Sequence, residues 1–318
     1  MPTAAWRNGE PVNAAHRPMT TAISLAVDSQ CVLGEGILWC ERHASLLWVD
    51  IQASQLWMHS PQERRTWHWT VHEKLACLAL GEDGRLLLGL ANGLYVADLD
   101  AASADELPLR HLHAVEHDLT DTRINDGRAD RHGNFVFGTK SERADHAAIG
   151  SFYQYSAQHG LRRLALPQAA IPNSICFSLD GATLYYCDSV QPRIQCCDYD
   201  AQTAGVSNLR TFVEMDHPDA SPDGSLIDSE GCLWNAQWGA SRVARYRADG
   251  QIDRIVELPV SQPSCCMIGG SDYDQLYITS ARDGLPPLEL AQTPTAGGIF
   301  QLPLLRRLGV PESKVILP

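Results

Sequence analysis

The sequence predicts an all-β fold, a six-bladed β-propeller whose blades are four-stranded antiparallel sheets. A strand-like run follows an acidic or glycine-containing turn six times along the 318 residues. These turns lie at His43, Gly84, Gly133, Gly181, Gly231 and Tyr273. Successive turns are therefore 41, 49, 48, 50 and 42 residues apart, which is close to the length of one four-stranded blade. Long helical periodicity is missing from the chain.

The predicted elements follow the same order in each copy of the repeat. The first strand-like runs are ERHASLLWVDI from Glu41, GEDGRLLLGL from Gly81, ADRHGNFVFGT from Ala129, SLDGATLYYCDS from Ser178, DSEGCLWNAQWG from Asp228 and SDYDQLYITSA from Ser271. Most copies continue into a further run, such as NGLYVADLD from Asn92 or RVARYRADG from Arg242. Alternation of apolar and polar residues that ends at turn residues indicates half-buried antiparallel strands. The best helical candidates, residues 285–293 and 101–116, are short and interrupted.

The two ends of the chain are expected to close the ring. The strand-like TAISLAVDSQCVL before the first repeat and KVILP at the end are predicted to pair in one blade. Residues 1–20 are expected to form a flexible N-terminal extension, and residues 21–318 a single propeller domain. A pair of β-sandwiches is the alternative, but near-equal spacing without a linker rich in Gly, Ser or Pro argues against two domains.

Composition excludes several classes of partner. The chain has 25 Lys plus Arg against 38 Asp plus Glu, a formal net charge of −13, which disfavours nucleic acids and membrane surfaces. No run approaches the roughly 18 to 20 apolar residues that span a bilayer, and the N-terminus lacks a secretion signal, so a cytoplasmic location is expected. The ten cysteines include no C-x-x-C spacing, so they are predicted to be reduced thiols packed in the core.

Polar residues recur at one place in the repeat. The innermost strand of each blade starts at the mouth of the central channel, and eight residues before the six turns stand Glu35, Ala76, Asn125, Asn173, Asp223 and Cys265. Taken singly, Asn125-Asp126-Gly127 and Pro222-Asp223-Gly224 are ordinary turn sequences. Their shared register instead predicts that two carboxylates and two amide oxygens converge. Such a set, of formal charge −2, suits Ca²⁺, Mg²⁺ or Mn²⁺, with Zn²⁺ or Fe²⁺ as further candidates.

Other chemistries find little support in the sequence. GxSxG, GxxxxGK[ST] and GxGxxG motifs are absent, and the pair His111-Leu112-His113 is interpreted as polar loop surface. Arg123 lies two residues before Asn125, so both side chains are expected on one side of an extended segment. Two roles for Arg123 stay open. Its guanidinium could donate two hydrogen bonds to substrate oxygens, or it could form a structural ion pair at the blade edge.

These motifs together resemble the gluconolactonase/regucalcin family, also called the senescence marker protein family, of six-bladed propellers. The matching strings are LGEG at 33–36, RINDGRAD at 123–130, FGTK at 137–140, IPNSICFSLDG at 171–181 and SPDGSLIDSEGCLW at 221–234. The C-terminal ITSARDGLPPLELAQTPTAGGIF is similar to bacterial sugar-acid lactonases in particular. The resemblance covers the chain from about Leu25 to the end.

The resemblance implies a metal-dependent lactonase. It places the metal ligands on Glu35, Asn173 and Asp223, and substrate binding on Arg123 and Asn125. The chain departs from the family pattern at two places: Ile37 replaces the usual proline after LGEG, and Glu142 is followed by Arg143 where animal members have a second acidic residue. Glu142 is a further candidate for substrate binding.

The activity expected from this resemblance is hydrolysis of an aldonolactone, such as an L-arabinono-, D-xylono-, D-galactono- or D-glucono-lactone. One divalent ion, Ca²⁺, Zn²⁺, Mn²⁺, Mg²⁺ or Fe²⁺, would polarise the carbonyl while Asp223 takes a proton from the attacking water. The alternatives are a calcium-binding regulator without catalysis and a propeller esterase that cleaves phosphotriesters. A monomer or weak homo-oligomer is expected, because a closed propeller needs no partner to bury its core.

Overall fold

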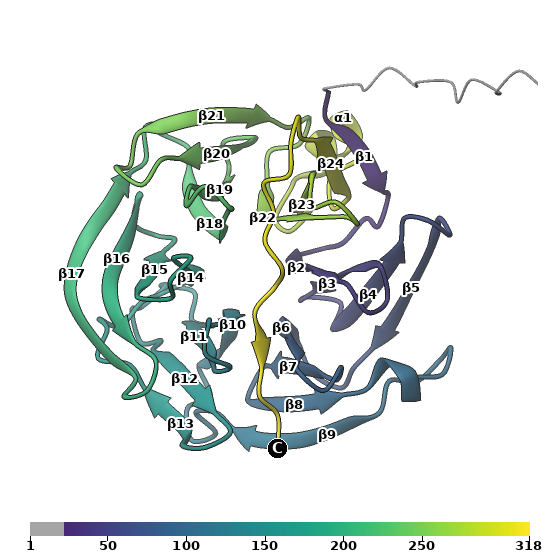
Figure 1. Cartoon of the computed structure of the whole chain (residues 1–318). Helices are drawn as coiled ribbons and strands as arrows, with labels where there is room; N and C mark the ends of the chain where they lie inside the picture. Colours follow the sequence, from purple (N-terminus) through teal and green to yellow (C-terminus); the bar gives the residue numbers. More distant parts are fainter. Residues whose placement is uncertain (1–21) are drawn as a thin grey trace, which may run out of the picture.

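Six antiparallel sheets surround a common centre, which confirms the fold class predicted from the repeat (Figure 1). The computed structural model describes residues 22–318, and the predicted flexible extension, residues 1–20, lies outside the described residues. Five sheets have four strands, and the sixth has a fifth strand at its inner edge. We number the blades one to six in the chain order of their innermost strands.

The first three blades each use four consecutive strands, given from the inside outward. Blade one contains β2 (Gly34–Cys40), β3 (Ser45–Asp50), β4 (Gln55–Ser60) and β5 (Arg65–Thr70). Blade two contains β6 (Leu75–Gly81), β7 (Leu86–Leu90), β8 (Gly93–Ala97) and β9 (Leu109–Ala114). Blade three contains β10 (Thr122–Ala129), β11 (Phe135–Ser141), β12 (Phe152–Ser156) and β13 (Gly160–Arg163).

The last three blades continue this order until the ring closes. Blade four contains β14 (Pro172–Phe177), β15 (Thr183–Asp188), β16 (Arg193–Asp200) and β17 (Gly205–Glu214). Blade five contains β18 (Ser221–Ile227), β19 (Leu233–Trp238), β20 (Arg242–Tyr246) and β21 (Ile252–Glu257). Blade six contains β22 (Pro263–Gly269), β23 (Gln275–Ser280), β24 (Ile299–Pro303) and β1 (Ser24–Val27).

The innermost strands are the most deeply buried part of each blade. Every residue of β6 and β22 is buried, because neighbouring blades pack against them. The outermost strand β17, by contrast, has no fully buried residue. A continuous apolar run therefore marks an inner strand, and a more polar run marks an outer one. All ten cysteines are free and buried, as predicted for thiols packed in the core.

The repeated turns join the first and second strands of each blade. The turn glycines of blades two to five have φ values of +90°, +87°, +74° and +74°, at Gly84, Gly133, Gly181 and Gly231. Glycine is favoured there because it adopts positive φ without a steric penalty. In blade six Tyr273 has φ +54° at the predicted position, whereas in blade one the positive φ falls on Ala44. The predicted turn at His43 is therefore present, over residues 41–44, but its residue of positive φ comes one position later.

The ring closes through its N-terminal strand alone. β1 pairs with β24 and supplies the outer strand of blade six. The C-terminal strand β25 (Lys314–Val315) instead pairs in parallel with β6 of blade two, so the prediction that both chain ends share one blade is wrong. The physical reason is that β24 has only one free edge, and β1 already occupies it.

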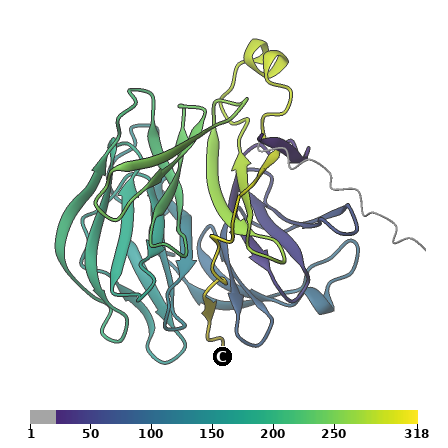
Figure 2. The same ribbon diagram turned by 45° about the horizontal axis from the view of Figure 1, so that its top comes forward.

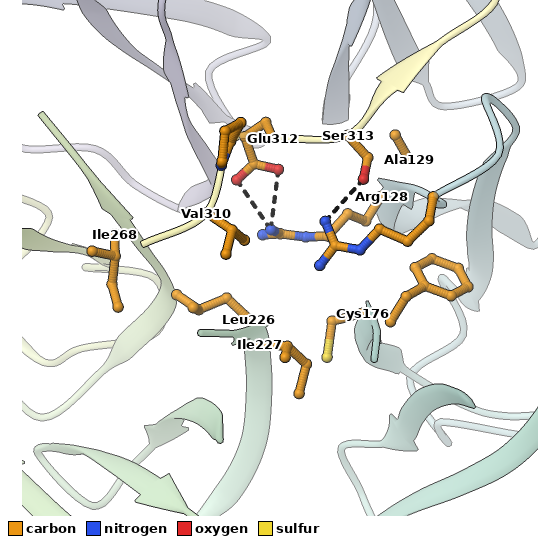
Figure 3. A pocket seen from close by; sticks show the side chains of 12 residues that line it. Arg128, Ala129, Cys176, Leu226, Ile227, Ile268, Val310, Glu312 and Ser313 are labelled. Atoms are coloured by element: carbon orange, nitrogen blue, oxygen red, sulfur yellow. Dashed lines mark hydrogen bonds and ion pairs between the residues drawn. The ribbon is translucent and has the colours of Figure 1, made fainter. Parts of the chain in front are cut away.

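The C-terminal segment crosses the centre of the ring to reach β6 (Figure 1). Glu312 there pairs with Arg128 at 3.2 Å, and Ser313 accepts a hydrogen bond from Arg131 at 3.0 Å (Figure 3). Both arginines lie near or just beyond the C-terminal end of β10. This segment therefore covers the end of the ring at which the inner strands finish.

In the described part of the chain, residues 22–318, helix is confined to two short pieces. α1 (Pro287–Gln292) lies within the predicted segment 285–293 and projects beyond the strands at one end of the ring (Figure 2). η1 (Leu99–Ala101) is a single 3₁₀ turn, and the candidate segment 101–116 contains the strand β9 rather than a helix. The pair His111-Leu112-His113 lies in this outer strand, which has no fully buried residue, so the pair is at the surface as interpreted but in a strand rather than a loop. No helix within residues 22–318 is long and apolar enough to cross a membrane.

Candidate functional site

The four polar residues found by their register line one cavity. Glu35, Asn125, Asn173 and Asp223 are all in the wall of a cavity of about 270 Å³. They come from β2, β10, β14 and β18, the innermost strands of four blades. The convergence predicted from the repeat is therefore present at the end of the ring where these strands begin.

A β-bulge interrupts every innermost strand near this cavity. The pairing with the second strand shifts between Glu35 and Leu38 in blade one, and between Asn173 and Cys176 in blade four. The other four innermost strands have the same irregularity at the corresponding place. A bulge re-aims side chains and increases local twist. This repeated irregularity explains how residues of an otherwise regular strand point into the cavity.

Two aspartates, the buried Asp50 and the half-buried Asp188, fix the chain segments that lead into the site. The Asp50 carboxylate accepts hydrogen bonds from the backbone N–H groups of Val32 at 2.7 Å and Leu33 at 3.1 Å. The Asp188 carboxylate does the same for Ala170 and Ile171, both at 2.9 Å. Glu35 and Asn173 follow these tethered segments by two residues each. The second strand of a blade thus holds the start of its first strand in place.

Glu35 and Asp223 concentrate negative charge in a buried place. Burial raises the pKa of Asp223, and the neighbouring Glu35 and Asp126 carboxyls raise it further. Burial likewise raises the pKa of Glu35, with a further rise from Asp126. Asp223 Oδ1 is buried and has no hydrogen-bond partner among residues 22–318. Like charges at close range and an orphaned carboxylate oxygen are what a bound divalent cation would compensate, so these residues fit a metal ion.

The two asparagines are held differently. Asn125 Nδ2 donates to Pro172 O at 3.0 Å and to Asn173 Oδ1 at 3.2 Å, while Asn125 Oδ1 accepts from Arg123 Nη1 at 3.1 Å. Asn173 Nδ2 donates to Ser189 Oγ at 2.9 Å, which turns its own oxygen away from that hydroxyl. Each amide oxygen thus accepts one hydrogen bond, that of Asn173 from the neutral Asn125 amide and that of Asn125 from the charged Arg123. Because the charged bond is the stronger one, the Asn173 oxygen is the easier of the two for an ion to engage.

Arg123 and Glu142 lie behind the cavity wall. The Arg123 side chain is only 3% exposed, and its Nε pairs with Glu142 Oε1 at 2.7 Å. Lys74 Nζ pairs with the other carboxylate oxygen of Glu142, also at 2.7 Å. Neither Arg123 nor Glu142 lines the cavity. In this conformation Arg123 thus forms the structural ion pair that was one of its two alternatives, although it shares a side with Asn125 as predicted.

Three residues of the cavity wall escaped prediction because they lie at the ends of second strands. Lys140 is near the end of β11, Trp238 ends β19, and Ser189 follows β15. Antiparallel pairing brings the end of a second strand beside the start of the first, and the register argument counted only first strands. Burial, with the neighbouring Arg123, lowers the pKa of Lys140 to about 8.

No cluster of three or more His, Cys, Asp or Glu side chains with metal-binding geometry occurs in the described part of the chain. The candidate set has only two residues of these types, Glu35 and Asp223. Its remaining oxygens come from amides, as the sequence predicted. Hard divalent cations bind to oxygen-only ligand sets of this kind more readily than to sets of thiolates or imidazoles.

The fold and this cavity define a six-bladed propeller with an oxygen-lined site at one end of its ring, and comparison with known proteins identifies its family. Residues 33–282 match the model of the SMP-30/Gluconolactonase/LRE-like region. The chain belongs to this family, which confirms the resemblance drawn from the motifs.

Two relatives and one solved structure show how similar the chain is to known members. It is 46% identical to the L-arabinolactonase of Azospirillum brasilense over 87% of this chain and 90% of that protein. It is 34% identical to the regucalcin of Sus scrofa over 91% of this chain and 96% of that protein. The crystal structure of a regucalcin from Agrobacterium tumefaciens, described as a calcium-binding protein, has a TM-score of 0.83 and 28% identity, covering 92% and 97% of the two chains.

Proposed function

We propose that this protein hydrolyses a sugar aldonolactone to the aldonic acid, with one divalent metal ion as cofactor. The observation that carries the proposal is the cavity in which Glu35, Asp223 and Asn173 present oxygens, while neither carboxyl forms an ion pair within residues 22–318 and Asp223 Oδ1 has no hydrogen-bond partner there. The high identity to an L-arabinolactonase over most of both chains supports the reaction class. It also makes L-arabinono-lactone the first substrate to test, with D-xylono-, D-galactono- and D-glucono-lactone as alternatives.

Each residue of the site has a definable role in this reaction. Glu35, Asn173 and Asp223 would hold the ion, which supplies Lewis-acid polarisation of the lactone carbonyl when bound. The unpartnered Oδ1 of Asp223 is positioned to accept a proton from the attacking water. Asn125 orients the lactone in the cavity. Arg123, held by Glu142, fixes Asn125 Oδ1 and so acts as a positioning residue.

The test is acid release from a panel of aldonolactones in a weakly buffered indicator assay. Chelator-treated protein is assayed alone and with Ca²⁺, Mn²⁺, Zn²⁺, Mg²⁺ or Fe²⁺. We expect turnover of at least one lactone, restored by at least one ion. Hydrolysis of aryl esters or phosphotriesters instead of any lactone would favour the esterase alternative.

A calcium-binding regulator without catalysis is the second candidate. It is supported by the identity to a regucalcin and by the structural similarity to a regucalcin described as calcium-binding. Tight Ca²⁺ binding by this protein with no turnover of any lactone in the panel would favour it. Both candidates use the same three ligands, so the assay rather than metal affinity separates them.

The metal-free protein is expected to lose stability as the pH rises. Burial raises the pKa of Glu35 and of Asp223 in the folded chain, Asp126 raises both further, and Glu35 also raises that of Asp223, whereas in the unfolded chain both titrate near pH 4. Above that pH the folded chain keeps protons that the unfolded chain has lost. The free energy of unfolding then falls by about 1.4 kcal/mol per pH unit for each retained proton.

Urea unfolding of chelator-treated protein between pH 5 and pH 8 measures this slope. The double variant Glu35→Gln/Asp223→Asn serves as the control, because it removes both carboxyls while keeping their shape. We expect the difference in slope between the two proteins to vanish when a binding divalent ion is present. Equal slopes without metal would contradict the assignment.

A further inference from the structure

Lys140 is the only cationic side chain in the cavity wall among residues 22–318. The two other cations nearby, Arg123 and Lys74, are both engaged by Glu142. Lys140 is half-buried, and its ammonium has no hydrogen bond or ion pair with any residue in the described range. The proposed site therefore contains one positive charge that the protein itself leaves unpaired.

The fold places this charge beside the residues already described. Lys140 lies on β11 directly opposite Arg123 of β10, and β10 also carries Asn125. The ammonium has three N–H donors and no acceptor. A partly desolvated charge without a partner costs free energy, and a hydrogen bond from the ammonium to a ligand oxygen in the cavity would offset that cost. Lys140 is therefore suited to bind a ligand with acceptor oxygens, and an anionic ligand would bind to it most strongly.

We infer that Lys140 binds the carboxylate of the aldonate product and orients the lactone carbonyl from which that carboxylate forms. The inference rests on the proposed function. In hydrolysis the oxygen of water bonds to the carbonyl carbon and the ring C–O bond breaks. One proton of the water ends on the former ring oxygen, and the other is released as the new carboxylic acid ionises. A neutral ligand thereby becomes an anion inside the cavity.

The charges of the wall favour a side-chain cation for holding that anion even when a divalent ion is bound, since three carboxylates and one divalent ion leave a formal charge of −1. Glu35, Asp223 and Asp283 line the same cavity, and carboxylates repel a carboxylate product. Lys140 offers the opposing charge on the side of β11. The expected consequence is that Lys140 discriminates between a carboxylate-bearing ligand and a neutral sugar alcohol of the same size.

Calorimetric titration of Ca²⁺-loaded protein with sodium L-arabinonate and with the neutral L-arabinitol tests this inference. Lys140→Met is expected to weaken arabinonate binding by roughly tenfold to a hundredfold, the loss typical of one charge-assisted hydrogen bond. Binding of arabinitol should stay unchanged. Lys140→Arg, which keeps the charge, should retain most of the affinity for arabinonate.

Lys314→Met is the matched control, because it removes an exposed lysine from β25 at the opposite end of the ring. It should bind arabinonate like the unaltered protein. Equal arabinonate affinities in Lys140→Met and unaltered protein, or equal losses for both probes, would overturn the inference. Failure of the unaltered protein to bind arabinonate would overturn it as well. If arabinonate binding depends on Lys140 while no lactone is hydrolysed, the inference stands and the proposed function fails.

Discussion

Asp223→Asn is expected to abolish lactone hydrolysis while leaving the fold intact. The substitution keeps the size and shape of the side chain but removes its capacity to accept a proton from water. General-base catalysis by one positioned group contributes about 10²- to 10⁴-fold to the rate, so kcat should fall by at least about a hundredfold. Loss of one negative ligand also weakens binding of the divalent ion.

The buried position of Asp223 lets this effect be separated from misfolding. Asp223 is 6% exposed, and burial and Glu35 raise its pKa, so a neutral side chain relieves repulsion in the metal-free protein. Urea unfolding without metal should show equal or greater stability for the variant.

Asp219→Asn is the matched control, since it removes the same charge from an exposed position on the loop that precedes β18. Its activity should equal that of the unaltered protein. A variant at Asp223 that keeps most of its activity would remove Asp223 from the role of base.

The architecture was predictable because each blade repeats the same local chemistry. Gly133 and Gly231 mark turns that need positive φ, and such requirements recur in the sequence at blade length. The partner of the C-terminal strand was not predictable in this way. Which edge Lys314 and Val315 pair with depends on which edges remain free after β1 has docked, and no local pattern records that.

The site was predictable only where one strand register determines it. Glu35, Asn125, Asn173 and Asp223 occupy the same place in four equivalent strands, so counting residues was enough to bring them together. Lys140 depends on cross-strand pairing instead, since it faces the cavity from the end of β11. The string FGTK contained it, but nothing in that string shows whether the lysine is paired or free.

The ion pair between Arg123 and Glu142 was also not predictable from the sequence. The alternation along β10 correctly placed Arg123 and Asn125 on one side. Whether Arg123 contacts substrate or a carboxylate depends on Glu142, nineteen residues away in the sequence. It also depends on Lys74, which lies in the connection from blade one to blade two and pairs with the same carboxylate. Only the assembled ring brings these three charges together.

Asp228→Ala is expected to destabilise the protein more than any surface substitution. Asp228 follows β18 and is fully buried. Its Oδ1 accepts from the backbone N–H groups of Glu230 at 2.9 Å and Cys232 at 3.1 Å. Its Oδ2 accepts from Trp234 Nε1 and from Arg245 Nε, both at 2.8 Å. One carboxylate thus satisfies the turn, a buried indole and a buried guanidinium.

Removal of this carboxylate leaves buried donors without acceptors. The Arg245 side chain is 6% exposed, and although Glu230 and Asp253 still pair with it, its Nε and the Trp234 indole lose their partner. Breaking a buried ion pair from one side costs about 3–5 kcal/mol, so the free energy of unfolding should fall by about that amount.

Urea unfolding of Asp228→Ala and Asp198→Ala in parallel measures the contribution of burial. Asp198 also pairs with an arginine, Arg210, but both side chains are 48% exposed, and water replaces the lost contact there. We expect the unfolding midpoint of Asp198→Ala to match that of the unaltered protein and the midpoint of Asp228→Ala to fall sharply. Because Asp228 lies at the end of the ring away from the cavity, the molecules of Asp228→Ala that remain folded should still hydrolyse lactone. Equal midpoints for the two variants would show that the buried network is dispensable, and the turn glycines together with core packing would then suffice to hold the blade.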